Sequence, residues 1–403
     1  MSLFIPHLIP YLGKFTGGPA VCVARIAAGL SLRGHDQAIF HPQLSSDGPA
    51  VAVEPTVKTY SSRTSRFFGF RSARGLYKQL YLNAPRFSLV HSHSLWSDVN
   101  RVAYRIAQNR QIPHVITVHG TLTSKAFRRR QWKKRLVAWW FQNEALQRAA
   151  CIHATSEEEY GDIRAFGVKA PVAVIPMPAS PPVSLTSSER EALLSTLRIP
   201  AQKQCLLYLG RLHPVKGLER LIRAWSRLSN EHNQWHLVLA GPDEQQYRNR
   251  LERLVSQSQC AATVSFTGPL DEREKSAVFQ ASNLFVMPSD FENFGVAIVE
   301  AMMASLPIVT TTGTPWSALP SARAGWWIPP TVDDLEQTLS AAMAMPTSGR
   351  AAMGHRGQEL ARPFTRESVA ASLEAVYLWL VGQREMPTCV RGIRGPGQWR
   401  AAA

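Results

Sequence analysis

Residues 284–304 read Leu-Phe-Val-Met-Pro-Ser-Asp-Phe-Glu-Asn-Phe-Gly-Val-Ala-Ile-Val-Glu-Ala-Met-Met-Ala. The first four residues are apolar and predict a buried strand, and Pro288 with Ser289 predicts the turn that ends it. From Val296 to Ala304 the pattern predicts a helix, which Pro307 prevents from continuing. The stretch is therefore typical of one strand–loop–helix unit in an α/β fold.

Two glutamates mark this unit, Glu292 in the predicted loop and Glu300 about one turn into the predicted helix. Helical side chains lean toward the helix N-terminus, so Glu300 should point back at the loop that holds Glu292. Carboxylates accept hydrogen bonds from sugar hydroxyls, and the N–H groups at the helix start, next to Gly295, favour a phosphate. The pattern predicts a pocket for a phosphorylated sugar. Two solvated acids in an ordinary loop and helix would give the same pair of residues.

The composition is that of a globular protein. The 403 residues are 45% hydrophobic and 18% charged, which is enough for two domains with sizeable cores. No apolar run approaches the roughly 18–20 residues of a membrane span, and the N-terminus lacks the basic region of a signal peptide. The five cysteines are scattered, without C-x-x-C spacing, and so predict a reducing cytosol without disulfides or a zinc site.

The positive charge is concentrated in the N-terminal half. Residues 1–183 hold 23 Lys+Arg against 9 Asp+Glu, whereas residues 184–403 hold 22 against 20. A charge balance this uneven indicates that something anionic approaches the N-terminal half. Nucleic acid, a phospholipid membrane and a phosphorylated substrate all fit this charge.

Short apolar strands alternate with amphipathic helices along both halves, which predicts two doubly wound parallel sheets of the Rossmann-like α/β class. A proline-rich stretch at residues 176–182 suits the linker between them. We expect an N-terminal domain at residues 1–183 and a C-terminal domain at 184–365. A last helix at 366–382 is expected to pack back on the N-terminal domain, and residues 383–403 are expected to be disordered.

Basic residues follow another predicted strand, in the segment Gly210-Arg211-Leu212-His213-Pro214-Val215-Lys216-Gly217. Ligands of open α/β folds bind at the carboxyl ends of strands. A guanidinium fork from Arg211 and the point charge of Lys216 suit a diphosphate there. Two solvated basic residues in a loop are the alternative.

With its supporting motifs, this order of segments resembles the family 4 retaining glycosyltransferases of the GT-B fold, in which two Rossmann-like domains face across a cleft. Thr16-Gly17-Gly18-Pro19, Val118-His119-Gly120 and Phe266-Thr267-Gly268 are among these motifs. The resemblance covers most of residues 1–382 and is densest from Tyr208 to Gly313.

The resemblance implies a role for each matching residue. Arg211 and Lys216 would neutralise the leaving nucleoside diphosphate, Glu300 would bind the ribose, and Glu292 would hold the transferred sugar. The implied catalytic residues are His119, Arg211, Lys216 and Glu292. The implied donor-binding residues are Gly17, Gly18, Leu270, Phe294, Gly295, Val296 and Glu300.

The resemblance also implies the reaction. A hexose-type sugar would pass from a UDP- or GDP-sugar to a hydroxyl of a glycan or lipid-linked acceptor, with the anomeric configuration retained. No metal ion or other cofactor is expected, since no Asp-x-Asp motif is present and the two basic residues would supply the positive charge. Cell-envelope polysaccharide, lipopolysaccharide or exopolysaccharide synthesis is the expected pathway. A sugar-nucleotide epimerase of the same architecture and a basic nucleic-acid-binding protein are the alternatives from other classes.

A basic and aromatic segment predicts where this reaction takes place. Trp132, Trp139 and Trp140 share one stripe of a predicted helix. Lys and Arg near an anionic bilayer contribute on the order of 1 kcal/mol each, and tryptophan favours the interface. We therefore expect a cytoplasmic protein bound peripherally to the inner face of the membrane. The expected membrane patch is Arg128, Arg129, Arg130, Lys133 and Lys134. Packing of the tryptophans on their own domain is the alternative.

Overall fold

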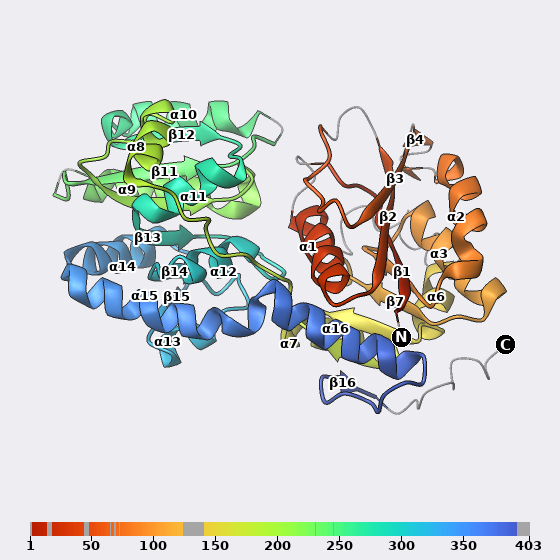
Figure 1. Cartoon of the computed structure of the whole chain (residues 1–403). Helices are drawn as coiled ribbons and strands as arrows, with labels where there is room; N and C mark the ends of the chain where they lie inside the picture. Colours follow the sequence, from red (N-terminus) through yellow and green to blue (C-terminus); the bar gives the residue numbers. More distant parts are fainter. Residues whose placement is uncertain are drawn as a thin grey trace. The chain divides into compact units, whose positions relative to one another are not determined.

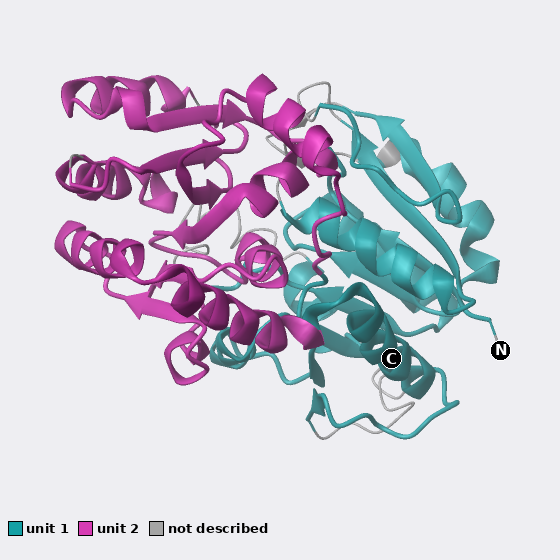
Figure 2. Cartoon of the chain, turned by 60° about the vertical axis from the view of Figure 1, so that its left-hand side comes forward, with its two compact units in different colours: residues 1–178, 364–403 teal, residues 179–363 magenta. Residues whose placement is uncertain are grey.

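The computed structural model describes residues 2–13, 18–43, 48–64, 66–67, 70–71, 73–123, 141–229, 231–244 and 246–392. The chain divides into two units, unit 1 with residues 1–178 and 364–403, and unit 2 with residues 179–363 (Figure 2). Unit 1 is therefore made from two separate stretches of sequence. Each boundary lies a few residues from the one that the sequence predicts.

Unit 1 is built on a sheet whose strands lie in the order β16-β9-β8-β7-β6-β1-β2-β3. Every neighbouring pair is parallel except β16 with β9. A separate hairpin pairs β4 (Arg66–Phe67) with β5 (Phe70–Arg71). The strands of the sheet are β1 (Phe4–Leu8), β2 (Asp36–Gln43), β3 (Lys58–Arg63), β6 (Val90–His93), β7 (His114–Thr117), β8 (Cys151–Ala154), β9 (Val172–Val174) and β16 (Val390–Arg391).

Helices cover both faces of this sheet (Figure 1). On one face, Ile5 shares a core with Ile26 of α1 and Tyr377 of α16. On the other face, Leu8 shares a core with residues of α2 and α3. This double cover explains why the inner strands are apolar along most of their length. The helices are α1 (Gly18–Leu32), α2 (Tyr77–Asn83), α3 (Asp98–Arg110), α6 (Asn143–Gln147), α7 (Glu157–Ala165) and α16 (Arg366–Leu380).

Unit 2 has a wholly parallel sheet in the order β12-β11-β10-β13-β14-β15. The chain builds outward from β10 to β12 on one side and then from β13 to β15 on the other. The strand order therefore reverses between β10 and β13, which is where open α/β sheets bind ligands. The strands are β10 (Gln204–Leu209), β11 (Trp235–Ala240), β12 (Val264–Gly268), β13 (Ser282–Met287), β14 (Ile308–Thr311) and β15 (Gly325–Ile328).

The helices of unit 2 follow the amphipathic pattern of the sequence. In α9, Leu218, Leu221, Ile222 and Trp225 recur at helical spacing, and all are buried. The helices are α8 (Ser187–Thr196), the single turn η6 (Pro214–Lys216), α9 (Leu218–Leu228), α10 (Tyr247–Gln257), α11 (Glu272–Ala281), α12 (Val296–Met303), α13 (Ala318–Ser321), α14 (Val332–Ala344) and α15 (Thr347–Ala361).

The expected disordered tail needs a correction in its first part. Residues 383–392 are described, and Val390 and Arg391 form β16 on the edge of the unit 1 sheet. Arg391 also pairs through both terminal nitrogens with the two carboxylate oxygens of Glu157, at 2.6 and 2.7 Å. Composition alone missed this segment, because two backbone pairings and a bidentate ion pair leave no hydrophobic pattern. Residues 393–403 lie outside the described residues.

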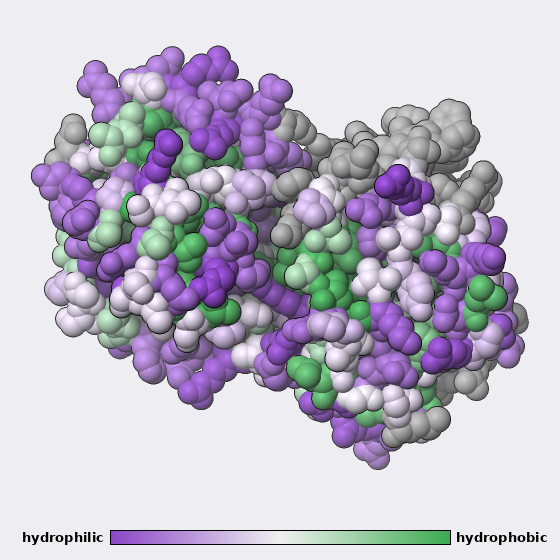
Figure 3. Space-filling model, turned by 45° about the horizontal axis from the view of Figure 1, so that its top comes forward, coloured by the Kyte–Doolittle hydropathy of each residue, from purple (hydrophilic) through white to green (hydrophobic). Residues whose placement is uncertain are grey.

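The surface drawn in Figure 3 is mainly hydrophilic, with hydrophobic side chains in scattered groups. Scattered apolar residues of this kind are normal on a globular protein. Among the residues that the structure describes, no helix is both long enough and apolar enough to cross a bilayer.

Candidate active site

Three loops of unit 2 are tied together at the carboxyl ends of their strands. The loop after β10 bonds to the loop after β11 through Leu212 N–H and Pro242 O, at 2.8 Å. It bonds to the loop after β13 through Asp290 N–H and Val215 O, also at 2.8 Å. Because β10 and β13 flank the point where the strand order reverses, these loops frame the expected ligand crevice of the unit.

Lys216 and Glu292 form an ion pair across two of these loops. Lys216 ends η6, and its side chain is only 10% exposed, while that of Glu292 is 19% exposed. The backbone N–H of Glu292 donates to Gly313 O at 2.8 Å, which fixes the position of the carboxylate. The sequence assigned these two side chains to different parts of a donor, yet they contact each other. An ammonium has three N–H donors, so Lys216 can hold Glu292 and still bind a phosphate oxygen.

Gly217 allows the first loop to approach the third. Its φ is +69°, and a Cβ atom there would stand 2.0 Å from Pro288 O. Any side chain would therefore push the loop of Lys216 away from the loop of Glu292.

Arg211 lies apart from that pair. Its guanidinium pairs with Glu244 of the loop after β11, and both side chains are substantially exposed, at 40% and 33%. The backbone oxygen of Arg211 accepts a hydrogen bond from the buried Tyr208 hydroxyl at 2.8 Å. The two predicted basic residues therefore belong to one loop but pair with different acids.

Glu300 lies about one turn into α12, as predicted, and it is buried there. It pairs with Lys275 of α11 at 3.1 Å, and the same ammonium reaches Glu272 at 3.0 Å. Lys275 was missed by the sequence analysis. The available signal was the capping box of Asp271 and Glu274, which marks the start of a helix directly after Leu270. Leu270 itself is partly buried between β12 and that helix.

Phe294, Gly295 and Val296 form the entry to α12. Gly295 is its N-cap, with φ of +79°, a left-handed conformation that favours glycine. Trp316 holds the turn by donating its indole N–H to Phe294 O at 2.7 Å. No acidic residue occupies the first turn of α12, so its N–H groups retain their preference for an anion.

In unit 1, His119 lies two residues beyond β7 and adopts a left-handed φ of 49°. Its neighbour Gly120 donates its N–H to the buried carboxylate of Glu159. The same carboxylate accepts from Thr155 N–H at 2.6 Å and from the Thr155 hydroxyl at 2.8 Å. Glu159 thus clamps the turn that carries His119. Glu159 was not among the residues predicted from sequence, although it follows the helix-capping Ser156 by three residues.

His119 is half-buried, and desolvation by the surrounding protein lowers its pKa to about 3, with a further contribution from His153. His119 is therefore neutral at physiological pH and can accept a hydrogen bond. Gly18 begins α1 and is exposed. Gly17 and the expected membrane patch, residues 128–134, lie outside the described residues.

Comparison with known families adds to this geometry. Residues 17–178 match the family described as glycosyl transferase 4-like domain, and residues 189–360 match the family described as glycosyl transferases group 1. The chain belongs to the group 1 glycosyltransferases. It is a retaining glycosyltransferase that uses a nucleotide sugar.

This glycosyltransferase is similar to curated and solved relatives over almost its whole length. The D-inositol 3-phosphate glycosyltransferase of Mycolicibacterium paratuberculosis is 23% identical, covering 94% of this chain and 88% of that protein. Anabaena HepE, solved with UDP-glucose, is 19% identical with a TM-score of 0.71, covering 92% and 99%. WaaG, a glycosyltransferase of lipopolysaccharide biosynthesis, is 17% identical with a TM-score of 0.70, covering 92% and 99%. These likenesses confirm the predicted GT-B fold.

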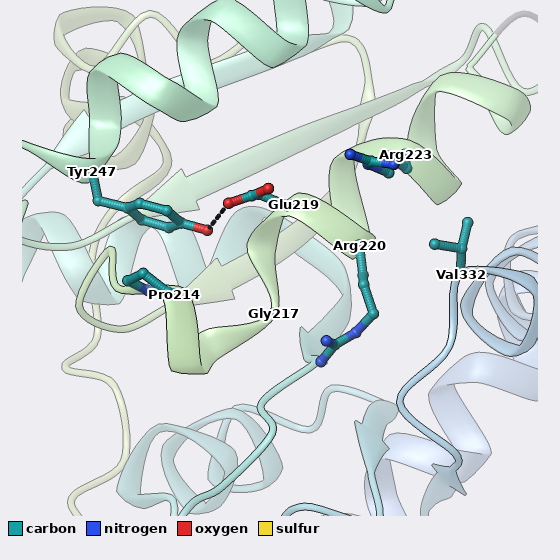
Figure 4. A pocket seen from close by; sticks show the side chains of 7 residues that line it. All are labelled: Pro214, Gly217, Glu219, Arg220, Arg223, Tyr247 and Val332. Carbon is teal, nitrogen blue, oxygen red and sulfur yellow. Dashed lines mark hydrogen bonds between the residues drawn. The ribbon is translucent and has the colours of Figure 1, made fainter. Parts of the chain in front are cut away.

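A separate hollow of about 300 Å³ lies beside the Lys216 loop, with Pro214 and Gly217 of that loop in its lining. In it, the Tyr247 hydroxyl donates to Glu219 at 2.8 Å (Figure 4). Arg220, also in its lining, donates to Asp290 at 2.6 Å. Neither Lys216 nor Glu292 lines this hollow, so it is distinct from the candidate active site of the glycosyltransferase. Its lining is Pro214, Gly217, Glu219, Arg220, Arg223, Tyr247 and Val332.

Proposed function

We propose that this glycosyltransferase transfers a hexose from a UDP- or GDP-hexose to a hydroxyl of a glycan or lipid-linked acceptor. The observation that carries the proposal is the partly buried Lys216–Glu292 pair at the strand-order reversal of unit 2. The helix start at Gly295 lies next to Glu292, and the same helix, α12, carries Glu300. This combination offers cationic donors for a diphosphate and anionic acceptors for sugar hydroxyls. UDP-glucose is the first donor to test, because the HepE relative was solved with it.

The proposed donor orientation follows from the charges. Lys216 binds the diphosphate and keeps its contact with Glu292, which accepts hydrogen bonds from hydroxyls of the transferred sugar. Glu300 accepts from the ribose hydroxyls, and Leu270 meets the base. Arg211 turns from Glu244 toward the diphosphate when the donor binds, since its ion pair is solvent-exposed and weak.

In the proposed reaction the bond between the anomeric carbon and the diphosphate oxygen breaks, and the acceptor oxygen attacks from the same face. Negative charge grows on the leaving diphosphate, and the fixed ammonium of Lys216 stabilises it. A donor phosphate oxygen takes the acceptor proton, so the atoms balance without a covalent enzyme intermediate. In this proposal Gly17 and Gly18 bind the donor, because a backbone without Cβ atoms can approach a phosphate closely, and His119 contacts the transferred sugar.

We propose that the acceptor belongs to envelope polysaccharide, lipopolysaccharide or exopolysaccharide synthesis, and that residues 128–134 hold the protein on the inner membrane surface. The N-terminal excess of positive charge supports this proposal. Sedimentation with liposomes tests it. Binding should require anionic lipid, weaken at high salt and disappear when Arg128, Arg129, Arg130, Lys133 and Lys134 become Gln. Equal binding to neutral vesicles contradicts the proposal.

A donor panel tests the reaction itself. The purified protein is incubated with UDP- or GDP-hexoses, with and without a mixed glycan acceptor, and both nucleoside diphosphate and unchanged donor are measured. We expect acceptor-dependent release of UDP or GDP, which Lys216→Met abolishes and Lys203→Met, an exposed lysine outside the site, leaves intact. Conversion of the donor sugar without any acceptor would instead identify an epimerase.

A further inference from the structure

Histidines are concentrated on one face of the unit 1 sheet. His7 of β1 is in register with His91 of β6, and His93 follows two residues later on the same face. His153 of β8 joins this face through Thr117, which is in register with both His93 and His153. All four imidazoles are fully buried. Buried polar groups of this number require a complete set of hydrogen bonds.

One set of these bonds is anchored by a backbone carbonyl. His153 Nε2 donates to Ile175 O at 2.6 Å, because a carbonyl can only accept. His153 Nδ1 then accepts from the Thr117 hydroxyl at 2.9 Å, and that hydroxyl accepts from His91 Nε2 at 2.7 Å. His91 Nδ1 in turn accepts from the Tyr377 hydroxyl of α16 at 2.7 Å. Both ring nitrogens of His91 are therefore occupied.

A second chain leads to the candidate active site. Gln37 of β2 offers its carboxamide oxygen to His7 Nε2 at 3.0 Å. His7 Nδ1 lies 3.0 Å from His93 Nε2, and His93 Nδ1 lies 3.4 Å from His119 Nε2. The chain thus runs across four neighbouring strands or their ends, from a buried glutamine to the residue that the family resemblance placed at the sugar.

The orientation of the Gln37 carboxamide sets the direction of each bond, and its nitrogen, which faces away from His7, has no hydrogen-bond partner among the described residues. With the Gln37 oxygen as the acceptor, His7 carries its proton on Nε2 and presents a lone pair on Nδ1. His93 must then donate from Nε2 and accept at Nδ1, and His119 must donate from Nε2. A neutral imidazole has one N–H, so the proton of every ring in the chain is assigned.

We propose that Gln37, His7 and His93 are positioning residues that fix the tautomer of His119, with its proton on Nε2 and its lone pair on Nδ1. His119 then presents an acceptor, rather than a donor, to its ligand. The next step rests on the proposed function. The Nδ1 lone pair of His119 accepts a hydrogen bond from a hydroxyl of the transferred hexose. Burial supports the neutral state that the chain needs, since desolvation lowers the pKa of His7 to about 4 and of His119 to about 3.

A metal ion is the competing use of these side chains. Ring nitrogens of His7, His91 and His93 lie within 4.8 Å of one another. Binding a metal through all three would break the His7–His93 bond and one of the two bonds that His91 makes. It would also place two positive charges in a fully buried group of neutral imidazoles. The hydrogen-bonded chain is therefore favoured.

Nitrogen NMR of the full chain, labelled with ¹⁵N in histidine rings, tests the proposal without any substrate. We expect Nε2–H tautomers for His7, His93 and His119, and couplings across the two N–H···N bonds. Three outcomes overturn the proposal: Nδ1–H tautomers along a reversed chain, averaged tautomers, or metal-shifted nitrogens that persist after dialysis against EDTA.

The variant Gln37→Met removes the acceptor at the far end while keeping the length of the side chain. A buried N–H without an acceptor is costlier than a bare ring nitrogen, so the chain should reverse and His119 should gain an Nδ1–H population. His114→Gln is the matched control, because His114 is a buried histidine that bonds to Ser92 outside the chain. An unchanged His119 tautomer in a folded Gln37→Met protein refutes the proposal, and if that variant does not fold, the wild-type spectrum still decides.

If the proposed function holds as well, Gln37→Met should lower kcat/KM by about ten-fold, the worth of roughly one hydrogen bond. A reversed tautomer with unchanged transfer would leave the chain intact and refute only the contact between His119 and the sugar. Absence of any transfer in the wild-type protein would count against the proposed function and not against the chain.

Discussion

In unit 2 the site residues are held by pairs of opposite charges, whereas in unit 1 the side chains that link His119 to the sheet interior are neutral imidazole rings. Lys216–Glu292 and Lys275–Glu300 each join two elements through opposite charges at a partly open sheet edge. His7, His91 and His93 lie instead beneath α1 and α16, where solvent cannot reach them. Charge can be used where a charged ligand will replace water, and a buried face must satisfy its polar groups without charge. Each unit is therefore sensitive to a different perturbation.

The largest effect is expected from Lys216→Met. It removes the cation from the leaving diphosphate and leaves the Glu292 carboxylate unpaired. We expect kcat to fall by about 10²–10³, the usual cost of losing one transition-state donor. Release of nucleoside diphosphate at saturating donor measures it.

The double variant Lys216→Met/Glu292→Gln separates the two consequences. It should recover the melting temperature lost in the single variant, because no unpaired carboxylate remains, but it should not recover kcat. Near-normal kcat in either protein would contradict the role of Lys216 in stabilising the leaving diphosphate.

As the pH falls, unit 1 should lose stability before unit 2, because its buried histidines are neutral in the folded state. Burial holds the pKa of His7 and of His153 at about 4, below the value of about 6.5 in an unfolded chain. Between these values the unfolded state binds more protons, so stability is lost as the pH falls from about 6.5 toward 4. Each such histidine contributes up to about 1.4 kcal/mol per pH unit.

Hydrogen exchange read by mass spectrometry, at pH 7 and pH 5 and corrected for intrinsic rates, compares the two units in one sample. Protection should fall more in β1, β6 and β8 than in β10 and β13. An equal loss in both units would mean that the buried imidazoles do not control acid stability.

Glu159→Gln should destabilise unit 1 by about 1–3 kcal/mol, because the amide turns an N–H donor toward groups that need an acceptor. Glu157→Gln on the same helix is the control. Glu157 is exposed and pairs only at the surface with Arg391, so a change within about 1 kcal/mol is expected. Urea unfolding of both variants measures the difference, and equal destabilisation would contradict the clamp.

Glu300→Gln should raise KM for the donor about ten-fold and leave kcat nearly unchanged, since ribose contacts alter little on the way to the transition state. Glu272→Gln, which removes the exposed partner of the same Lys275, serves as the control. A fall in kcat with an unchanged KM would place Glu300 at the reacting centre instead of the ribose.

The smallest effect is expected from chelation. With Lys216 and Arg211 as the cations of the site, transfer should proceed at the same rate in EDTA. Loss of activity that Mn²⁺ or Mg²⁺ restores would contradict this role of the two basic residues.

Periodicity predicted the two parallel sheets, because most buried strands are apolar runs between turns. Periodicity does not identify the strand Cys151–Ala154, because the polar His153 interrupts its apolar pattern. In the structure, the His153 imidazole is buried and donates to Ile175 O. Trp326 and Trp327 lie in β15 at the sheet edge, where both are only partly buried. Polar or partly exposed strands have too weak a hydrophobic pattern to be predicted from periodicity.

The sequence predicted the local position of a site residue where the residue type itself indicates a particular backbone geometry. Glycine at 295 and a carboxylate one helical turn later indicated their own places. The partners were not predictable, since Lys275, Glu159 and Gln37 are recognised only when the fold brings them to Glu300, Gly120 and His7. Sequence spacing contains the local geometry of a motif and none of the contacts that cross between elements.

The return of the chain to unit 1 sets the order in which the protein can form during synthesis. Tyr377 and its neighbours in α16 complete the core beneath His91, so unit 1 cannot close until residues beyond 377 have left the ribosome. Unit 2 is a continuous stretch, residues 179–363, and is fully made before then. Until then, the part of the histidine face that α16 covers stays exposed on the nascent chain. Any stop codon before α16 would leave that face permanently open.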